Sequence, residues 1–249
     1  MPPQTIDCKI CGHGAGFVAA ADLSVNCERV ALPASGELIP YYHCAECGFT
    51  FTPAFDDWTP AQFRQRIYNE GYALVDREFS SIRPLRQAGD LARMLEPLKG
   101  KIRILDYGGG AGVFARRMTE LGFATVSYDP LYQSATSLAG ERFELIHCRE
   151  VIEHAPDPRA FVADLLRHLA DDGAVYLSTA LQPEGITSHL LDWWYLAPRN
   201  GHVSLFSKFS LARLWIDQGL QFGHFSEFVH LASRGNPPCL PLLMERGGA

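Results

Sequence analysis

From residue 101 onward, short apolar runs alternate with amphipathic stretches that end near glycine. Short apolar runs closed by Asp or Gly are typical of buried parallel strands, and the amphipathic stretches are typical of helices. The expected strands are residues 102–105, 124–128, 143–147 and 174–179, and the expected helices are residues 113–121, 158–169 and 211–218. Asp171-Asp172-Gly173 is predicted to form the turn between helix 158–169 and the next strand.

The alternation of strand and helix predicts an α/β fold with a mostly parallel, Rossmann-like sheet and right-handed crossovers. Two last short runs, residues 220–224 and 228–231, are predicted to add an antiparallel C-terminal pair. Ligands bind such sheets at the carboxyl ends of the strands. We therefore expect a binding site after strands 102–105, 124–128 and 143–147.

The first hundred residues have a different pattern. Residues 1–58 are rich in Cys, Gly and Pro and form a small N-terminal region. Residues 59–99 are predicted to be helical, because Thr59 can cap a helix that Pro60 begins and apolar residues recur at helical spacing from 84 to 98. The expected organisation is a small region (1–58), a helical lid or linker (59–99) and a sheet domain (100–249).

Composition and charge fit a globular protein. Hydrophobic residues make up 47% and charged residues 20% of the 249 residues, which is ordinary for a globular enzyme. The net charge of −6 and the lack of a basic run argue against nucleic acid or an anionic membrane as partner. Without a membrane-length apolar stretch or a signal peptide, we expect a cytoplasmic protein whose seven cysteines are thiols or metal ligands. The oligomeric state is left open.

A glycine-rich loop follows the first expected strand, which Asp106 ends. The glycines are Gly108, Gly109, Gly110 and Gly112. Glycine lets a ligand approach the backbone, and the helix that follows offers free N–H groups. Asp129 ends the next strand, where a carboxylate can accept both hydroxyls of a ribose. Residues 110–115 also fit the dinucleotide pattern G-x-G-x-x-A, but Asp106 would repel a pyrophosphate and suits a cationic amino-acid group. A glycine turn without a ligand is the third alternative.

Residues 104–112, together with Asp129, resemble motif I and the acidic ribose ligand of class I S-adenosylmethionine-dependent methyltransferases. Residues 143–158 and 172–179 resemble later segments of the same family, and the similarity runs from about 84 to 231. The resemblance implies an enzyme that binds S-adenosylmethionine and methylates a small molecule. The cofactor-binding residues that it implies are Asp106, Tyr107, Gly108, Gly110, Gly112, Asp129, Pro130, Arg149 and Glu150.

This chain departs from the family pattern after Asp129. Only 18 residues (130–147) separate Asp129 from Cys148, where family members usually fit a further helix and an edge strand. In relatives that segment carries an acidic residue for the adenine amino group. The adenine contact is therefore not assigned.

Four cysteines near the N-terminus are spaced like metal ligands. Cys8 and Cys11 form one C-x2-C pair, and Cys44 and Cys47 form another after 32 residues. Four thiolates suit tetrahedral Zn²⁺ and leave no open position, so the predicted zinc is structural. The alternative is that some of these thiols are free core residues. The arrangement also resembles the zinc-binding region of sugar C-methyltransferases, in which Tyr-rich helices follow, as around Tyr68 here. That resemblance implies a lid or substrate wall, and a sugar nucleotide or natural-product intermediate as acceptor.

Three histidines are candidate catalytic bases. Methyl transfer needs a positioned nucleophile and removal of its proton, for which histidine is well suited at neutral pH. His154 follows the third strand of the expected site, and His189 and His202 flank an aromatic segment after the fourth. For each of them a purely structural role is the alternative.

Two other functions remain open at this stage. Glu150, Glu153 and His154 have the spacing of a magnesium site that resembles the one in ubiquinone-pathway O-methyltransferases, which would make the protein a Mg²⁺-assisted O-methyltransferase acting on a quinone or catechol-like precursor. Because the segment after Asp129 is too short for the usual adenine-binding helix and strand, the chain would also suit a binding protein that is stabilised by zinc and has lost catalysis.

Overall fold

The computed structural model of the chain describes residues 2–131 and 138–246. Residue contacts divide the chain into two compact units, each built from three separate segments. The first unit comprises residues 1–77, 152–161 and 180–214, and the second comprises residues 78–151, 162–179 and 215–249. The boundaries expected at 58 and 99 stay a prediction. The segment between Asp129 and Cys148, where relatives carry an extra helix and strand, lies partly outside the described residues.

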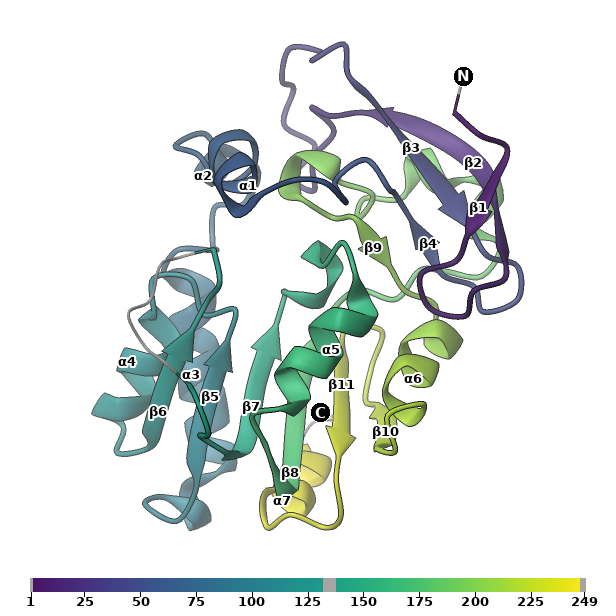
Figure 1. The fold of residues 1–249 in the computed structure, drawn as a ribbon. Coiled ribbons are helices and arrows are strands. Elements are labelled where there is room, and N and C mark those ends of the chain that lie inside the picture. Colours follow the sequence, from purple (N-terminus) through teal and green to yellow (C-terminus); the bar gives the residue numbers. More distant parts are fainter. Residues whose placement is uncertain (1, 132–137, 247–249) are drawn as a thin grey trace. The chain divides into compact units, whose positions relative to one another are not determined.

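The second unit contains the expected Rossmann-like sheet (Figure 1). Its strands are β5 (Arg103–Tyr107), β6 (Ala124–Tyr128), β7 (Phe143–Arg149), β8 (Leu169–Ser178), β10 (Gln221–His224) and β11 (Val229–Ser233). They are ordered β10-β11-β8-β7-β5-β6, with β5 to β8 parallel and β10 and β11 antiparallel. The mostly parallel sheet and the antiparallel C-terminal pair are therefore confirmed.

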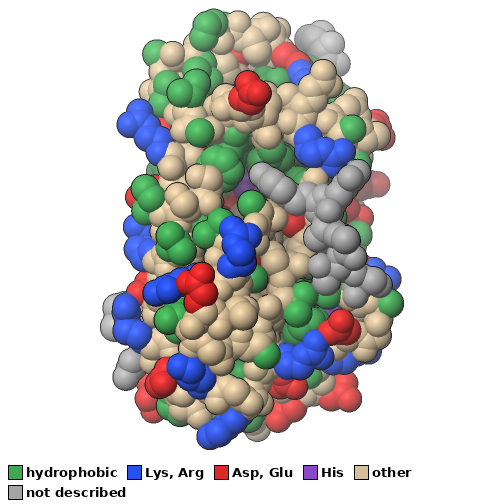
Figure 2. Space-filling view, turned by 90° about the vertical axis from the view of Figure 1, so that its left-hand side faces the viewer, with side chains coloured by type: hydrophobic (Ala, Val, Ile, Leu, Met, Phe, Trp, Pro, Cys, Tyr) green, Lys and Arg blue, Asp and Glu red, His purple; other side chains and the backbone are tan. Residues whose placement is uncertain are grey.

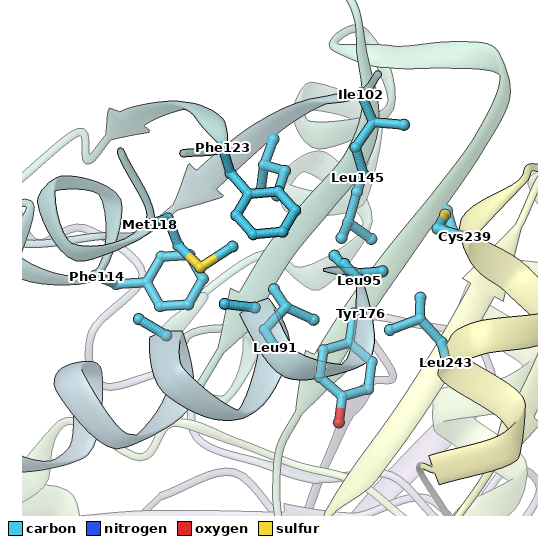
Figure 3. Packing of buried hydrophobic residues seen from close by; sticks show 14 of the residues in the cluster. Leu91, Leu95, Ile102, Phe114, Met118, Phe123, Leu145, Tyr176, Cys239 and Leu243 are labelled. Carbon is cyan, nitrogen blue, oxygen red and sulfur yellow. The ribbon is translucent and has the colours of Figure 1, made fainter. Parts of the chain in front are cut away.

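One face of this sheet packs against α3 (Ile82–Met94), α4 (Val113–Glu120) and α7 (Cys239–Arg246). Figure 3 shows the cluster, in which Leu91 of α3 and Phe114 and Met118 of α4 lie over Leu145 and Tyr176 of the sheet. Ala88, Leu91 and Leu95 of the apolar face expected for the helix at 84–98 are buried, whereas Leu85 is exposed. Helix α3 stops at Met94, and a 3-10 turn, η1 (Glu96–Leu98), follows. Ile104 of β5 and Leu145 of β7 belong to this core, which holds the two neighbouring strands together.

The turn expected at Asp171-Asp172-Gly173 is wrong. Helix α5 (Pro158–Leu166) ends earlier than predicted, and β8 begins at Leu169, so these residues lie inside the strand. Leu169 is fully buried and pairs with Phe143, after which the register of β7 and β8 shifts. A Cβ on Gly173 would lie 2.8 Å from Leu169 Cδ1, so glycine permits the irregularity rather than ending the helix. Helix α6 (Lys208–Ile216) likewise begins and ends before the predicted 211–218.

The first unit contains a second sheet that the apolar pattern did not predict. Its antiparallel strands are β1 (Thr5–Asp7), β2 (Gly14–Asp22), β3 (Leu38–His43), β4 (Thr50–Phe51) and β9 (Ser204–Leu205), in that order. The short helices of this unit are α2 (Tyr72–Val75), η2 (Ile152–His154), η3 (Ile186–Ser188), η4 (Leu190–Asp192) and η5 (Pro198–Asn200). Helix α1 (Pro60–Arg66) begins where predicted, because Thr59 caps it through a reciprocal pair of hydrogen bonds with Gln62.

No helix in the described part of the chain is long and apolar enough to cross a membrane. Among the described side chains on the face drawn in Figure 2, Lys and Arg are interspersed with Asp and Glu.

Candidate functional site

The glycine loop connects β5 to α4 and has the backbone conformation that only glycine adopts easily. Gly108, Gly110 and Gly112 have φ values of 78°, 53° and 71°. Gly108 N–H donates to the Tyr128 carbonyl at 2.8 Å, which ties the loop to the end of β6. A Cβ on Gly108 would lie 2.6 Å from the Val151 side chain. Glycine is therefore required at Gly108, because a side chain there would clash with Val151. Without side chains, the backbone of the loop can also be approached closely by a ligand.

Asp106, at the end of β5, is a buried carboxylate with partners on both neighbouring strands. Its Oδ1 lies 3.2 Å from His147 Nδ1 on β7, and its Oδ2 accepts from Ser127 Oγ on β6 at 3.4 Å. Burial lowers the pKa of His147, and the Asp106 charge opposes that shift. The His147 ring stacks on Phe114, with ring centroids 3.7 Å apart. A neutral imidazole with its proton on Nδ1 therefore orients the Asp106 carboxylate.

Asp129, directly after β6, joins its strand end to the glycine loop. Its Oδ2 accepts from Gly110 N–H at 2.9 Å, and its Oδ1 accepts from Leu131 N–H at 2.8 Å. The neighbouring Pro130 is exposed. The structure thus brings Asp106, Asp129 and the glycines together at the carboxyl ends of β5 and β6, where the fold predicts a ligand.

The other three predicted cofactor residues have contacts of different kinds. The Tyr107 hydroxyl donates to Asp164 Oδ2 on α5 at 2.5 Å, and burial raises the pKa of this phenol. The Arg149 guanidinium lies over the Tyr176 ring at 5.6 Å, and its Nε is a buried donor without a hydrogen-bond partner in the described residues. Glu150 has the unusual φ of 58°, and its carboxylate accepts from Ser178 Oγ at 2.7 Å.

This set of groups fits S-adenosylmethionine. The ligand carries a sulfonium, an ammonium, a carboxylate and a ribose diol. The second unit supplies carboxylates at two strand ends, bare glycine backbone, and a buried arginine Nε that has no hydrogen-bond partner among the described residues. Asp129 would hold the ribose and Asp106 would face the cationic amino-acid end. When bound, the cofactor supplies the electrophilic methyl group.

The four cysteines of the first unit converge. Their sulfurs lie within 4.8 Å of one another, with Cys8 and Cys47 at 3.6 Å and Cys11 and Cys44 at 3.4 Å. All seven cysteines of the chain lie in the described residues, and none of them forms a disulfide. The contact with Cys47 lowers the pKa of Cys8 to about 5, so one thiol of this pair ionises readily.

Each cysteine pair lies in the same kind of turn. Gly12 N–H donates to the Cys8 carbonyl at 2.9 Å, and Gly48 N–H donates to the Cys44 carbonyl at 2.7 Å. Gly12 and Gly48 have φ values of 75° and 71°. Two matching turns bring four sulfurs within 4.8 Å of one another, and four thiolates fit the tetrahedral coordination that structural Zn²⁺ takes.

Lys9 joins the first of these turns to two other segments of the unit, and sequence analysis did not single it out. Its Nζ donates to the Thr52 carbonyl at 3.1 Å, the Pro156 carbonyl at 2.9 Å and Asp56 Oδ1 at 2.5 Å. Burial lowers the pKa of this ammonium, and Asp56 opposes the shift. Arg159 also donates to the Ile10 carbonyl, so two cations connect the cysteine turn to residues 152–161.

Two of the three candidate catalytic histidines come together in the first unit. The rings of His154 and His202 have centroids 5.1 Å apart, and both side chains cluster with the buried carboxylate of Glu153. His154 Nδ1 lies 3.0 Å from the Gly201 carbonyl, and His202 Nδ1 lies 2.9 Å from the Tyr195 carbonyl. His189 is exposed at the end of η3, and it is not part of this cluster.

Comparison with known proteins gives the family. Residues 79–224, more than half of the chain, match the family described as "Methyltransferase domain". A ubiquinone biosynthesis O-methyltransferase from Parvibaculum lavamentivorans is 32% identical over 111 residues, which cover 35% of this chain and 44% of that protein. Its counterpart from Rickettsia conorii is 26% identical over 169 residues, which cover 55% of this chain and 56% of that protein. The matches thus span about half the length of these curated relatives.

Solved structures similar to this chain are distant. A magnesium protoporphyrin IX methyltransferase from Synechocystis has 16% identity and a TM-score of 0.47, with 73% of this chain and 97% of that one covered. A 1,6-didemethyltoxoflavin-N1-methyltransferase from Burkholderia thailandensis has 14% identity and a TM-score of 0.49, with 78% and 99% covered. Similarities of this size carry no information about the acceptor.

An α/β sheet with a glycine loop between two strand-end carboxylates is typical of proteins that bind a nucleotide-type cofactor. The family match makes the class specific: the chain belongs to the family described as "Methyltransferase domain".

Proposed function

We propose that the protein transfers the methyl group of S-adenosylmethionine to a sugar nucleotide or related natural-product intermediate, with His154 or His202 as the general base. The observation that carries this proposal is the pair of imidazoles whose Nδ1 atoms each face a backbone carbonyl. A ring that donates its Nδ1–H to a carbonyl keeps the lone pair on Nε2, which is the form that removes a proton.

The surroundings of His154 support an acceptor site on the first unit. Tyr68 lies between α1 and α2. Its ring is edge-on to the His154 ring, with centroids 5.9 Å apart. The centroids of the Tyr68 and Tyr72 rings are 5.0 Å apart. This aromatic wall suits the role of substrate lid that the sugar C-methyltransferase resemblance implies. An acidic C–H beside a carbonyl, or a hydroxyl, would lose its proton to the imidazole while the methyl group is transferred.

The first test separates the cofactor from the acceptor. Titration calorimetry with S-adenosylmethionine should show binding, and NADH should show none, because Asp106 and Asp129 disfavour a pyrophosphate. Transfer of a labelled methyl group would then be measured with a keto-deoxysugar nucleotide and with a catechol-like quinone precursor. Label in the sugar supports the proposal, whereas label in the catechol alone would refute the proposed acceptor.

The histidines are tested by His154→Gln and His202→Gln. At least one variant should lose about 100-fold or more in kcat, the range of general-base catalysis, while its dissociation constant for S-adenosylmethionine stays unchanged. His189→Gln provides the matched comparison, because this imidazole is exposed and outside the cluster. A loss confined to His189→Gln would refute the assignment of the base.

The second candidate is a Mg²⁺-assisted O-methyltransferase, which the names of the curated relatives favour. Its proposed ligands are Glu150, Glu153 and His154. Ser178 Oγ donates to Glu150 Oε1 at 2.7 Å, a hydrogen bond that leaves the second carboxylate oxygen of Glu150 available to a metal ion. Full activity after EDTA treatment would dismiss this candidate. The third alternative was a zinc-containing binding protein without catalytic activity. The match to the methyltransferase-domain family favours an enzyme over that alternative.

We also propose that Cys8, Cys11, Cys44 and Cys47 hold a structural zinc ion. Four thiolates close the coordination sphere, so the ion would stabilise the first unit and take no part in methyl transfer. Small regions with short strands often need such a staple.

A further inference from the structure

We propose that Arg149 binds the α-carboxylate at the amino-acid end of the cofactor and makes the site selective for a zwitterionic amino acid. The inference rests on the proposed cofactor, S-adenosylmethionine, in which Asp106 would hold the ammonium of the same amino acid. It does not depend on the acceptor or on the histidine base, because cofactor binding is measured without methyl transfer.

The Arg149 guanidinium is a half-buried cation with a donor that the protein leaves unused. Its Nε is buried, and no described residue accepts a hydrogen bond from it. The guanidinium lies over the face of the Tyr176 ring, 5.6 Å from the centroid. A ring face attracts the charge but does not replace an oxygen acceptor for the N–H groups. A buried donor without an acceptor costs free energy, which an anionic ligand would recover.

Arg149 lies on the same face of the sheet as Asp106, at the edge where the fold predicts a ligand. Asp106 of β5 is the register partner of His147 of β7, and Arg149 follows His147 by two residues. Alternate residues of a strand point to the same face. The stacking of His147 on Phe114 identifies this face as the one covered by α4, which begins at the glycine loop.

The backbone on both sides of Arg149 is held in place. Arg149 is the register partner of Ser178 in β8, and the N–H of Glu150 donates to the Ser178 carbonyl at 3.0 Å. On the other side, the Val151 side chain lies so close to the glycine loop that a Cβ on Gly108 would be 2.6 Å from it. The arginine therefore projects from a segment fixed against the loop, so little ordering is needed when a ligand binds.

The titratable groups around the guanidinium do not neutralise it. Burial lowers the pKa of His147, and the Arg149 charge lowers it further, so this imidazole is neutral. Burial raises the pKa of Tyr176 against the opposing effect of Arg149, so the phenol is neutral as well. The carboxylate of Glu150, the next residue, accepts from Ser178 Oγ at 2.7 Å. A ligand carboxylate would supply the missing negative charge.

The spacing of the two charged side chains suits an α-amino acid. Asp106 and Arg149 are about 5 Å apart across the strands and about 7 Å apart along them, from the strand spacing and the rise of two residues. An α-amino acid carries its ammonium and carboxylate on one carbon, so a ligand between these side chains can contact one with each group. The planar fork of arginine matches a carboxylate with two parallel hydrogen bonds.

The test compares two cofactors that differ in this carboxylate alone. S-adenosylmethionine and its decarboxylated form are titrated by calorimetry into the full chain. The wild type should bind S-adenosylmethionine about 10- to 100-fold more tightly, which is the range for a hydrogen bond between charged groups. In Arg149→Gln the preference should disappear, because binding of S-adenosylmethionine weakens while binding of the decarboxylated form stays the same or tightens.

Three further variants separate this role from a general effect of charge. Arg117→Gln removes an exposed cation of α4 that pairs with Glu120, and it should bind both ligands like the wild type. Asp106→Asn should weaken both ligands by a similar factor, because both keep the ammonium. Arg149→Lys keeps the charge without the fork, and it should restore part of the preference for S-adenosylmethionine.

Two results would overturn the role of Arg149 and leave the cofactor intact. One is wild-type protein that binds the two ligands with equal affinity. The other is a folded Arg149→Gln variant that keeps the full preference. If this variant unfolds, the wild-type ratio and Arg149→Lys still decide. Wild-type protein that binds neither ligand would instead refute the proposed cofactor, and the role of Arg149 with it.

Discussion

A single methyl group at Gly109 should disrupt the cofactor site. A Cβ built on Gly109 would lie 2.7 Å from Asp106 Cγ and overlap Asp106 Oδ2 and Ser127 Oγ. Asp106 cannot easily turn aside, because it is buried and bonded to His147 on one side and Ser127 on the other. The substitution Gly109→Ala therefore shifts the loop or breaks these hydrogen bonds.

The expected loss of binding free energy in Gly109→Ala follows from two costs, the steric overlap and the broken hydrogen bond. Overpacking a tight site typically costs about 1–3 kcal/mol, and losing a hydrogen bond to a charged group costs about 1.5–3 kcal/mol. Taking the lower part of each range gives about 3 kcal/mol, which corresponds to an increase of about 100-fold in the dissociation constant for S-adenosylmethionine. Titration calorimetry measures this directly.

Gly89→Ala is the matched control. Gly89 lies inside α3, and a Cβ there would meet nothing within 4 Å. The same added methyl should raise stability by about 0.5–1 kcal/mol through helix propensity and leave cofactor binding unchanged. If Gly109→Ala binds the cofactor within threefold of the wild type and unfolds at the same temperature, the steric argument for the loop is refuted.

Three further outcomes are expected. Cys44→Ser should lower the zinc content by one equivalent per chain, by elemental analysis, whereas Cys239→Ser should leave it unchanged, because this buried thiol is outside the cluster. Lys9→Met should lower the free energy of unfolding in urea by about 1–3 kcal/mol, since it leaves the Thr52 and Pro156 carbonyls without this donor, whereas the exposed Asp56 carboxylate is solvated; an unchanged value would mean that these hydrogen bonds contribute nothing. Burial lowers the pKa of His230 to about 4, below the value of about 6.5 in the unfolded chain, so its contribution to stability is complete above pH 6.5 and is lost as the pH falls toward 4. Stability should fall by about 1.4 kcal/mol per pH unit per proton in that window, less steeply in His230→Gln, and equal slopes in both proteins would contradict the assignment.

The sheet of the second unit could be predicted because its signals are local. Strand 124–128 was placed correctly, and the antiparallel pair near the C-terminus was recognised from two short runs. The partnership of Asp106 with His147 was within reach as well, because parallel strands that both end in polar residues align them side by side, as the register shows. The error at residues 171–173 arose because a glycine after two aspartates is also typical of a turn.

The first unit could not be predicted in the same way, because its contacts are long-range. Strand β4 has two residues, and it pairs with β9 from a segment about 150 residues away. A two-residue strand has no periodicity to detect. The clustering of His202 with Glu153 likewise depends on β9 and η2 being joined, which no local pattern encodes. The cysteine spacing was the exception, because metal ligands are recognisable without the sheet that carries them.

The dispersed assembly of the first unit has a consequence for synthesis on the ribosome. All four cysteines lie within the first 47 residues, but the strand that completes their sheet is Ser204–Leu205. At translation rates of roughly 5–20 residues per second, β4 waits on the order of ten to thirty seconds for its neighbour. During that interval its edge is open to wrong pairing. A zinc ion captured early would hold the nascent strands together, so zinc supply should affect the yield of folded protein more strongly than the stability of protein that has already folded.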